Sequence, residues 1–263
     1  MWQLAFFLGP LCFLLALSFW SVESFRLTPD FTSANWDKVY AQAYFWRALG
    51  VTILYAVLGS LLVSLLAFPA AFHIAFRLSP QARRLALMLI GIPFFTSYLV
   101  RIYSWQVYLG DSGIINNASV SLGIAPLNML NTAFGTFVGY ATLCLPLVLL
   151  LQVFGLSQVP QQTVNAAHNL GCGPVRIIYK VVIPGARAGL AIAALFAFIL
   201  IFGDFASPIY LGGANAQTLS ILITDLTKAG QQWPRAAVVA VTMIVVLLAT
   251  AFATLRFAYQ ARK

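Results

Sequence analysis

Long apolar stretches constrain this chain more than any other feature. They run for about 20 residues each, the length that an α-helix needs to cross the hydrocarbon core of a membrane. Only 8% of the residues are charged, against about 25% in soluble domains. Strands of transmembrane barrels would be about ten residues long and would alternate. The sequence therefore predicts an all-α membrane protein with one transmembrane domain over residues 1–263 and six spans, at 4–22, 49–76, 85–109, 133–154, 189–211 and 236–255.

The remaining segments are less informative. The first apolar stretch has neither a basic start nor a small-residue cleavage site, so we expect an uncleaved anchor. The second exceeds the membrane thickness, and we expect Pro69 to bend it or its end to protrude. Residues 114–130 form a candidate amphipathic or re-entrant piece, and 23–47 show no motif.

The distribution of charge predicts the orientation. The turn at 77–84, the loop at 155–188 and the C-terminal tail hold nine basic residues and no acid, whereas the other segments hold six of each. The positive-inside rule places the basic side in the cytoplasm, and six spans then place both termini there. These cations are few and lie next to lipid headgroups, so we expect contact with membrane lipid and no nucleic acid. The nine are Arg77, Arg83, Arg84, Arg176, Lys180, Arg187, Arg256, Arg262 and Lys263.

The most informative polar segment is the loop at 157–189. Pro160 at a first helical position predicts one short helix, which Gly171 ends as a left-handed cap. Gly173 and Pro174 predict the start of a second helix, and Pro184 its end. Its apolar residues recur at helical spacing, which predicts one apolar face made of Val175, Ile178, Tyr179 and Val182. Such a helix pair is suited to insertion into a partner's cleft; the alternative is a hairpin that packs on its own spans.

Two groups of residues resemble a known family. Asn165-Ala166-Ala167, then Gly171, then Ile183-Pro184 resemble the E-A-A…G…hydrophobic-Pro loop of ATP-binding cassette (ABC) importer permeases, with Asn165 in place of the family's Glu. The strings 101–105, 110–116, 203–208 and 211–213 resemble permeases of the spermidine/putrescine type. The resemblance implies a type I ABC importer permease fold in which this loop is the coupling helix that docks on an ATPase. The docking residues it implies are Asn165, Ala166, Ala167, His168, Gly171, Arg176, Ile183 and Pro184.

The source of energy is expected to lie on another chain. None of the four lysines follows a glycine, so the chain has no phosphate-binding loop. We therefore expect a non-catalytic subunit that binds no cofactor, with ATP and Mg on a separate, dimeric ATPase. The resemblance further implies a second, non-identical permease, an extracytoplasmic solute-binding protein and a location in the bacterial inner membrane.

An acid within the fifth span raises a choice between two roles. An ionised carboxylate near the membrane centre costs about 2.5–3.5 kcal/mol, so Asp204 should face a cavity or a partner. Either it attracts cationic cargo, with Tyr103 and Trp105 adding cation–π contacts, or it pairs with Arg101. Asp111 and Pro208, in the strings quoted above, complete the candidate substrate pathway.

Three functions are open at this stage. The first is a permease subunit of an ATP-driven importer for a polyamine, a similar cation or another small organic solute. The second is a transporter driven by an ion gradient, which would need more coupling carboxylates or repeated halves. The third is a scaffold or channel, which requires neither Asp204 nor a docking loop.

Overall fold

The computed structural model describes residues 2–23, 26–213, 217–228 and 231–260. The chain divides into two compact units, which are treated separately here: Met1–Leu54 with Ala216–Ala249, and Tyr55–Asn215 with Thr250–Lys263. The described elements are α1 Trp2–Leu17, β1 Ser21–Glu23, β2 Arg26–Thr28, α2 Ala34–Tyr40, α3 Ala43–Phe76, α4 Pro80–Gly91, η1 Ile92–Phe95, α5 Tyr98–Leu109, α6 Ile114–Ser121, α7 Ala133–Leu156, α8 Gln161–Asn169, α9 Pro174–Ile177, η2 Ile178–Val182, α10 Ile183–Gly203, η3 Pro208–Gly212, α11 Leu219–Lys228 and α12 Trp233–Gln260.

Helices dominate the described residues, as predicted. By length and composition, four are long and apolar enough to cross a membrane: Ala43–Phe76, Ala133–Leu156, Pro174–Gly203 and Trp233–Ala258. A fifth candidate is the pair Pro80–Phe95 and Tyr98–Ser121, which is bent by 89°. Helix α1 is apolar but shorter than these. The predicted count of six spans therefore stays a prediction.

The segment predicted as the third span, 85–109, is broken. Pro93 opens the 3₁₀ helix η1, and Thr96 and Ser97 are extended before α5 begins at Tyr98. Because proline cannot donate a backbone hydrogen bond and extended residues leave the helical ladder, the chain changes direction here. Tyr98 thus becomes the first residue of a new helix.

The first unit contains a small feature that the sequence did not predict. The strands β1 and β2 pair antiparallel, with Ser21 opposite Thr28. Asn35 is buried and its amide donates to the backbone carbonyls of Ser18 (3.1 Å) and Trp20 (2.6 Å), which ties α2 to the end of α1. Residues 26–47, within the segment that showed no motif, therefore form defined elements.

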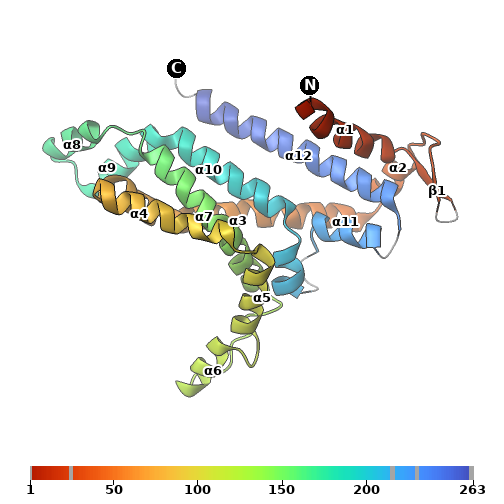
Figure 1. The fold of residues 1–263 in the computed structure, drawn as a ribbon, viewed down its shortest axis with the longest axis horizontal. Coiled ribbons are helices and arrows are strands. Elements are labelled where there is room, and N and C mark those ends of the chain that lie inside the picture. Colours follow the sequence, from red (N-terminus) through yellow and green to blue (C-terminus); the bar gives the residue numbers. More distant parts are fainter. Residues whose placement is uncertain (1, 24–25, 214–216, 229–230, 261–263) are drawn as a thin grey trace. The chain divides into compact units, whose positions relative to one another are not determined.

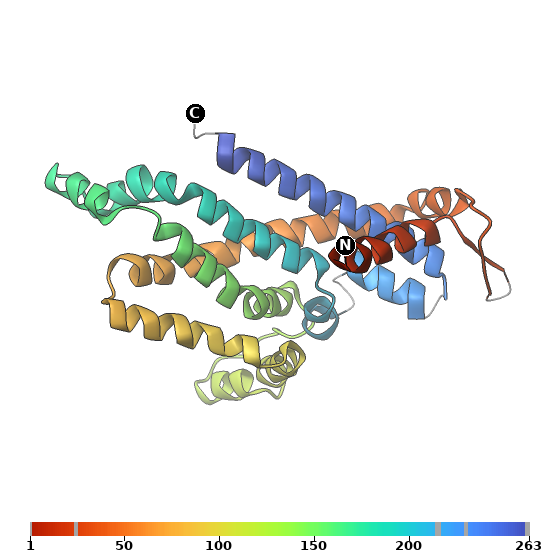
Figure 2. The same cartoon turned by 45° about the horizontal axis from the view of Figure 1, so that its top comes forward.

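The second unit is built around α7 and α10, which lie side by side (Figures 1 and 2) with α8 and α9 at one end of the pair. Two glycines allow the close approach: a Cβ built on Gly155 would lie 2.8 Å from Gly189 Cα. Further along, Gly139 admits Ser207, because a Cβ there would lie 2.5 Å from Ser207 Oγ. Small residues let helix backbones pack closely in membranes, and here they position both ends of α10.

Candidate functional site

The predicted coupling loop forms two short helices. Helix α8 begins at Gln161, one residue after the predicted first position, with Pro160 as its extended N-terminal cap. Gly171 has φ +80°, as predicted for a left-handed cap. The amides of Gly171 and Cys172 donate to the carbonyls of His168 (2.9 Å) and Ala167 (3.1 Å), the Schellman pattern that closes a helix end. The turn is therefore rigidly defined by backbone bonds.

The second helix differs from the prediction at Pro184. It begins at Pro174 after the N-cap Gly173, as predicted, but it continues without a stop into α10. The five residues Ile178–Val182 form a π-helix immediately before Pro184. A wider turn accommodates a proline that lacks an N–H and whose ring would clash with the preceding turn. The prediction that Pro184 ends the helix is therefore wrong.

The burial of this second helix differs from the predicted apolar face. Val182 is fully buried and Ile178 is half-buried, whereas Val175 and Tyr179 are exposed. The predicted single apolar stripe is thus split. Ile177 takes the inward position beside Val182. Leu170, 85% exposed at the tip of the turn, joins Val175 and Tyr179 in an uncovered apolar surface.

The remaining docking candidates lie around this turn. Ala167 and Ile183 are half-buried, and the side chain of Asn165 accepts a hydrogen bond from Gln161 Nε2 at 3.3 Å. The loop therefore presents polar and small side chains beside the apolar tip. The exposed candidates are Asn165, Ala166, His168, Gly171, Arg176 and Pro184.

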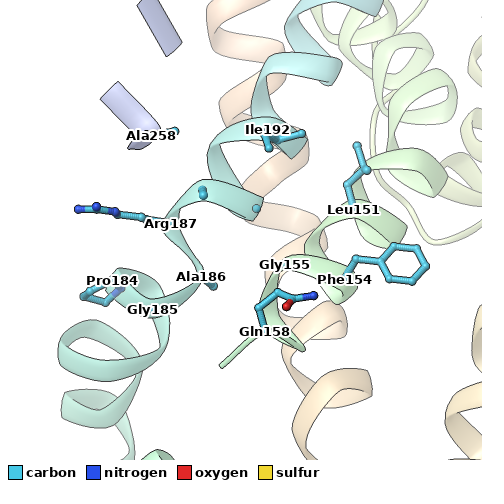
Figure 3. Close-up of a pocket in the computed structure, with 12 residues that line it drawn as sticks. Leu151, Phe154, Gly155, Gln158, Pro184, Gly185, Ala186, Arg187, Ile192 and Ala258 are labelled. Atoms are coloured by element: carbon cyan, nitrogen blue, oxygen red, sulfur yellow. The ribbon is translucent and has the colours of Figure 1, made fainter. Parts of the chain in front are cut away.

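A groove of about 850 Å³ lies near the crossing of α7 and α10 (Figure 3). Gly155 and Gly189 form its floor, and Gln158 and Arg187 lie beside them. In Figure 3 the side chain of Arg187 points away from α7. The groove follows from the paired glycines, which leave no side chains above the contact.

Asp204 lies in a break between helices rather than within one. Helix α10 ends at Gly203, and Asp204 is extended (φ −75°, ψ 129°). Its Oδ1 accepts from the amide of Ala206 at 3.0 Å, and its Oδ2 from the amide of Ser207 at 3.2 Å. A side-chain oxygen that satisfies free amides in this way caps a helix N-terminus. Asp204 therefore begins the next helical segment, which continues through η3.

A second helix contributes to the Asp204 cluster. Tyr98 Oη donates to Asp204 Oδ2 at 2.8 Å and lies 2.5 Å from Ser207 Oγ. Arg101 lies over the Tyr98 ring, 5.9 Å from its centroid, and its Nη1 donates to the carbonyl of Thr142 at 3.0 Å. The arrangement in which Arg101 pairs with Asp204 is therefore not formed; Tyr98 stands between them.

The other predicted pathway residues contact different neighbours from those of this cluster. The ring of Tyr103 packs on Tyr210 (5.1 Å between centroids) and that of Trp105 on Tyr108 (5.9 Å). Asp111 is exposed in the turn after α5. Pro208 is buried in the segment that Asp204 caps.

The string at 110–116 has a structural role. Asn116 is buried, donates to the carbonyls of Gly110 and Leu127 (3.0 Å each) and accepts from the amide of Leu127 at 2.7 Å. A Cβ on Gly113 would lie 2.6 Å from the carbonyl of Val107. The motif thus closes the loop after α5.

Sequence reasoning missed Tyr98 and Ser207. Ser207 follows Asp204 by three residues, the spacing at which a capping aspartate meets an amide, so this signal was present in the quoted string. Tyr98 had no such signal, because it lies 106 positions away from Asp204.

A long-helix membrane bundle whose α7 and α10 are joined by an exposed helix-turn-helix is the fold of ABC importer permeases. The chain matches the solved bacterial ABC transporter involved in the import of the acidic polysaccharide alginate with a TM-score of 0.80 and 17% identity, covering 100% of this chain and 92% of that one. It matches the inward-facing MetNI methionine ABC transporter with a TM-score of 0.58 and 16% identity, covering 82% and 97%.

Residues 63–263 match the family model of the binding-protein-dependent transport system inner membrane component, and the chain belongs to this family. It is 27% identical to the spermidine/putrescine transport system permease protein PotB of Haemophilus influenzae, covering 94% of this chain and 86% of that protein. It is 25% identical to the putative 2-aminoethylphosphonate transport system permease protein PhnU of Salmonella typhi, covering 86% and 75%. The predicted resemblance to ABC importer permeases is confirmed, and the chain is a multi-pass inner-membrane permease component.

Proposed function

We propose that this permease forms the translocation pathway for a small organic cation of the spermidine/putrescine type. The observation that carries the mechanical part is the helix-turn-helix at α8–η2, which exposes Leu170, Val175 and Tyr179 and continues into α10. The choice of cargo is supported by relatives named for spermidine and putrescine that align with most of the chain.

The proposed energy source is a partner ATPase dimer that binds ATP and Mg and grips this loop. An uncovered apolar tip beside small side chains is the surface that a helix-in-groove contact buries. The docking set keeps the residues named above, with Asn165, Ala166 and His168 on α8, Gly171 at the turn and Arg176 on α9. Asn165 contributes a hydrogen bond where the family's Glu would contribute a charge. Half-buried Ala167 and Ile183 support this surface, and exposed Pro184 adds to it.

The proposed transmission path is the uninterrupted helix Pro174–Gly203. A continuous helix carries a displacement along its axis, and the paired Gly155 and Gly189 hold it closely against α7. Its far end is the break at Asp204. A push on the docking loop would therefore act on the polar cluster of Asp204, Tyr98 and Ser207.

The proposed pathway runs past this cluster. Asp204 is 8% exposed and accepts three hydrogen bonds, so it keeps acceptor capacity for at most about one further donor. In this proposal it provides the negative charge and Pro208 the irregular wall. Tyr103 and Trp105 provide aromatic faces, Arg101 holds Tyr98, and Asp111 lies at the outer approach.

The proposed assembly contains a second, sister permease and an extracytoplasmic solute-binding protein, with lipid around the remaining surface. Both termini would lie in the cytoplasm, on the side of the coupling loop, as the basic residues of the 77–84 and 155–188 segments favour. The family's description as a binding-protein-dependent system supports the delivery protein.

The test is reconstitution of the chain in proteoliposomes with its ATPase, sister permease and binding protein. We expect uptake of labelled putrescine or spermidine that requires ATP on the ATPase side and stops when the ATPase is left out. Uptake driven by an ion gradient without the ATPase would favour the secondary transporter instead. If the ATP-hydrolysing complex transports neither amine into the vesicles, the proposal that the cargo is a polyamine is wrong.

A second candidate is the import of another small organic solute. The relative named for 2-aminoethylphosphonate has an identity close to that of the polyamine relatives and a similar coverage. In the same proteoliposomes, import of 2-aminoethylphosphonate without import of either amine would select this candidate.

A further inference from the structure

A groove at the start of α4 gathers basic side chains next to uncovered apolar ones. It has a volume of about 550 Å³. Arg83 and Arg84 lie at one part of its lining, and Leu78, Leu87 and Met88 at another. The groove lies in the second compact unit. Its lining residues include none from the exposed tip of the coupling loop and none from the Asp204 cluster.

The charges in this groove have no acidic counterpart nearby in the chain. Asp111 and Asp204 are the only acidic residues between 55 and 215. Asp204 is engaged by Tyr98, and Asp111 follows α5. Arg77 adds a third cation just before the helix. The group of basic residues can therefore bind an anion from outside the chain.

Helix α4 itself adds to the positive charge at this groove. Helix α4 begins at Pro80 with Ser79 as its cap and has no acidic residue in its first turn. The N-terminal end of a helix is its positive end and favours anions. Arg83 and Arg84 place two further positive charges within the first five residues of α4, an arrangement that is unfavourable until an anion joins it.

The other side of the groove is suited to hydrocarbon. No residue of α4 is buried, and Met88 is 64% exposed. Leu85, Leu89 and Ile92 are exposed as well and continue the apolar surface toward η1. Basic side chains at one end of an apolar helix surface match the headgroup and acyl regions of a lipid.

Arg83 also connects the groove to the coupling loop. Its Nη2 donates to Ser157 Oγ, and that hydroxyl donates to the carbonyl of Val153 at 2.5 Å. Ser157 caps the C-terminal end of α7, where the loop begins. An anion held by Arg83 would therefore be linked, through Arg83, to Ser157 at the start of the docking loop.

From these observations we propose that the Arg83–Arg84 groove binds one anionic phospholipid, with its phosphate on the two guanidinium groups and its chains along Met88 and Leu87. Guanidinium groups bind phosphate through paired hydrogen bonds. The position at a basic membrane-facing turn favours a lipid over a soluble anion. This site is independent of the identity of the cargo.

The test is lipid retention by the purified transporter complex, measured by native mass spectrometry with added phosphatidylglycerol or phosphatidylcholine. We expect one retained phosphatidylglycerol per chain and no comparable retention of phosphatidylcholine. Arg84→Gln should weaken retention about fivefold, since a basic residue near an anionic surface contributes about 1 kcal/mol. Lys228→Gln removes an exposed cation outside the groove and should change nothing.

Three results would overturn the proposal. Equal retention of phosphatidylglycerol by Arg84→Gln and Lys228→Gln would show that the groove does not bind the lipid. Displacement of the bound anion by inorganic phosphate would indicate a soluble ligand. Loss of ATPase co-purification in Arg84→Gln with phosphatidylglycerol retained would make the groove a protein contact. If the variant does not assemble, the melting temperature of the unchanged complex must rise with phosphatidylglycerol and not with phosphatidylcholine.

Discussion

The hydroxyl of Tyr98 lies 2.8 Å from Asp204 Oδ2. Tyr98 is the first residue after the break between η1 and α5, and Asp204 is the first residue after α10. One hydrogen bond thus joins two helix breaks. Ser207, 2.5 Å from the same hydroxyl, completes the link. The breaks are not independent irregularities, and a change at one should be felt at the other.

Tyr98→Phe should lower the stability of the second unit. The substitution removes the hydroxyl and leaves a buried carboxylate with one donor fewer, at a cost of about 1–3 kcal/mol. The thermal unfolding of the purified complex in detergent measures this. Tyr108→Phe is the matched control, because Tyr108 is exposed. Equal melting temperatures for the two variants would show that the hydrogen bond contributes little.

Asp204→Asn should lower the uptake of cationic cargo about tenfold or more. Two unit charges 4 Å apart interact with about 1 kcal/mol in water and about 4 kcal/mol near a protein surface, and the substitution removes the negative charge of this pair. The amide oxygen can still accept from Ala206, whereas the NH2 group replaces the oxygen that accepts from Ser207 and Tyr98, so one of the two cap hydrogen bonds is retained. Labelled-amine uptake in proteoliposomes measures the effect, with Asp225→Asn, at an exposed position of α11, as control. Unchanged uptake at normal protein levels would remove Asp204 from the pathway.

Gly189→Ala should destabilise the contact between α7 and α10. The added methyl group would overlap with Gly155 Cα, and overpacking costs about 1–3 kcal/mol. Gly50→Ala in α3 is the control, since a Cβ there meets nothing within 4 Å. It should be neutral or stabilising by about 0.5–1 kcal/mol. Thermal unfolding distinguishes the two, and a stable Gly189→Ala variant would contradict the close packing.

Gly171→Ala should distort the turn of the coupling loop. Alanine in the left-handed conformation costs about 1–2 kcal/mol, and the Schellman bonds depend on that conformation. Gly173→Ala is the control, because Gly173 has φ −65° and open space around its Cα. Co-purification of the ATPase with tagged permease should fall for the first variant only. Equal yields would show that docking does not require this turn.

Leu170→Ser should weaken ATPase docking without affecting the fold. Leu170 is 85% exposed, so the permease loses almost no burial, whereas a docked leucine contributes about 1.5–3 kcal/mol. We expect the dissociation constant to rise about tenfold or more. Leu122→Ser, at a site that is 76% exposed, is the matched control. If both variants bind the ATPase equally, the apolar tip does not reach it.

The loop shows how far local pattern could predict this protein. Gly171 and Gly173-Pro174 predicted the turn and the second helix correctly, because caps depend on the few residues around them. Pro184 misled, since the chain passes through a π-helix and continues past a proline that should have ended the helix. Val175 and Tyr179 are exposed, so they do not share a buried face with Val182. A proline restricts its own backbone, but packing decides how the chain accommodates it.

Apolar runs and the loop motif in the sequence by themselves determined the membrane class and the family. Both depend on composition or on a motif within one continuous stretch of the sequence, here residues 165–184. Only the tertiary structure decided the partners of Asp204. It placed Tyr98, 106 positions away, between that acid and Arg101. It also set Arg83 of α4 beside the end of α7. Such contacts arise when separate helices pack, and no local pattern encodes them.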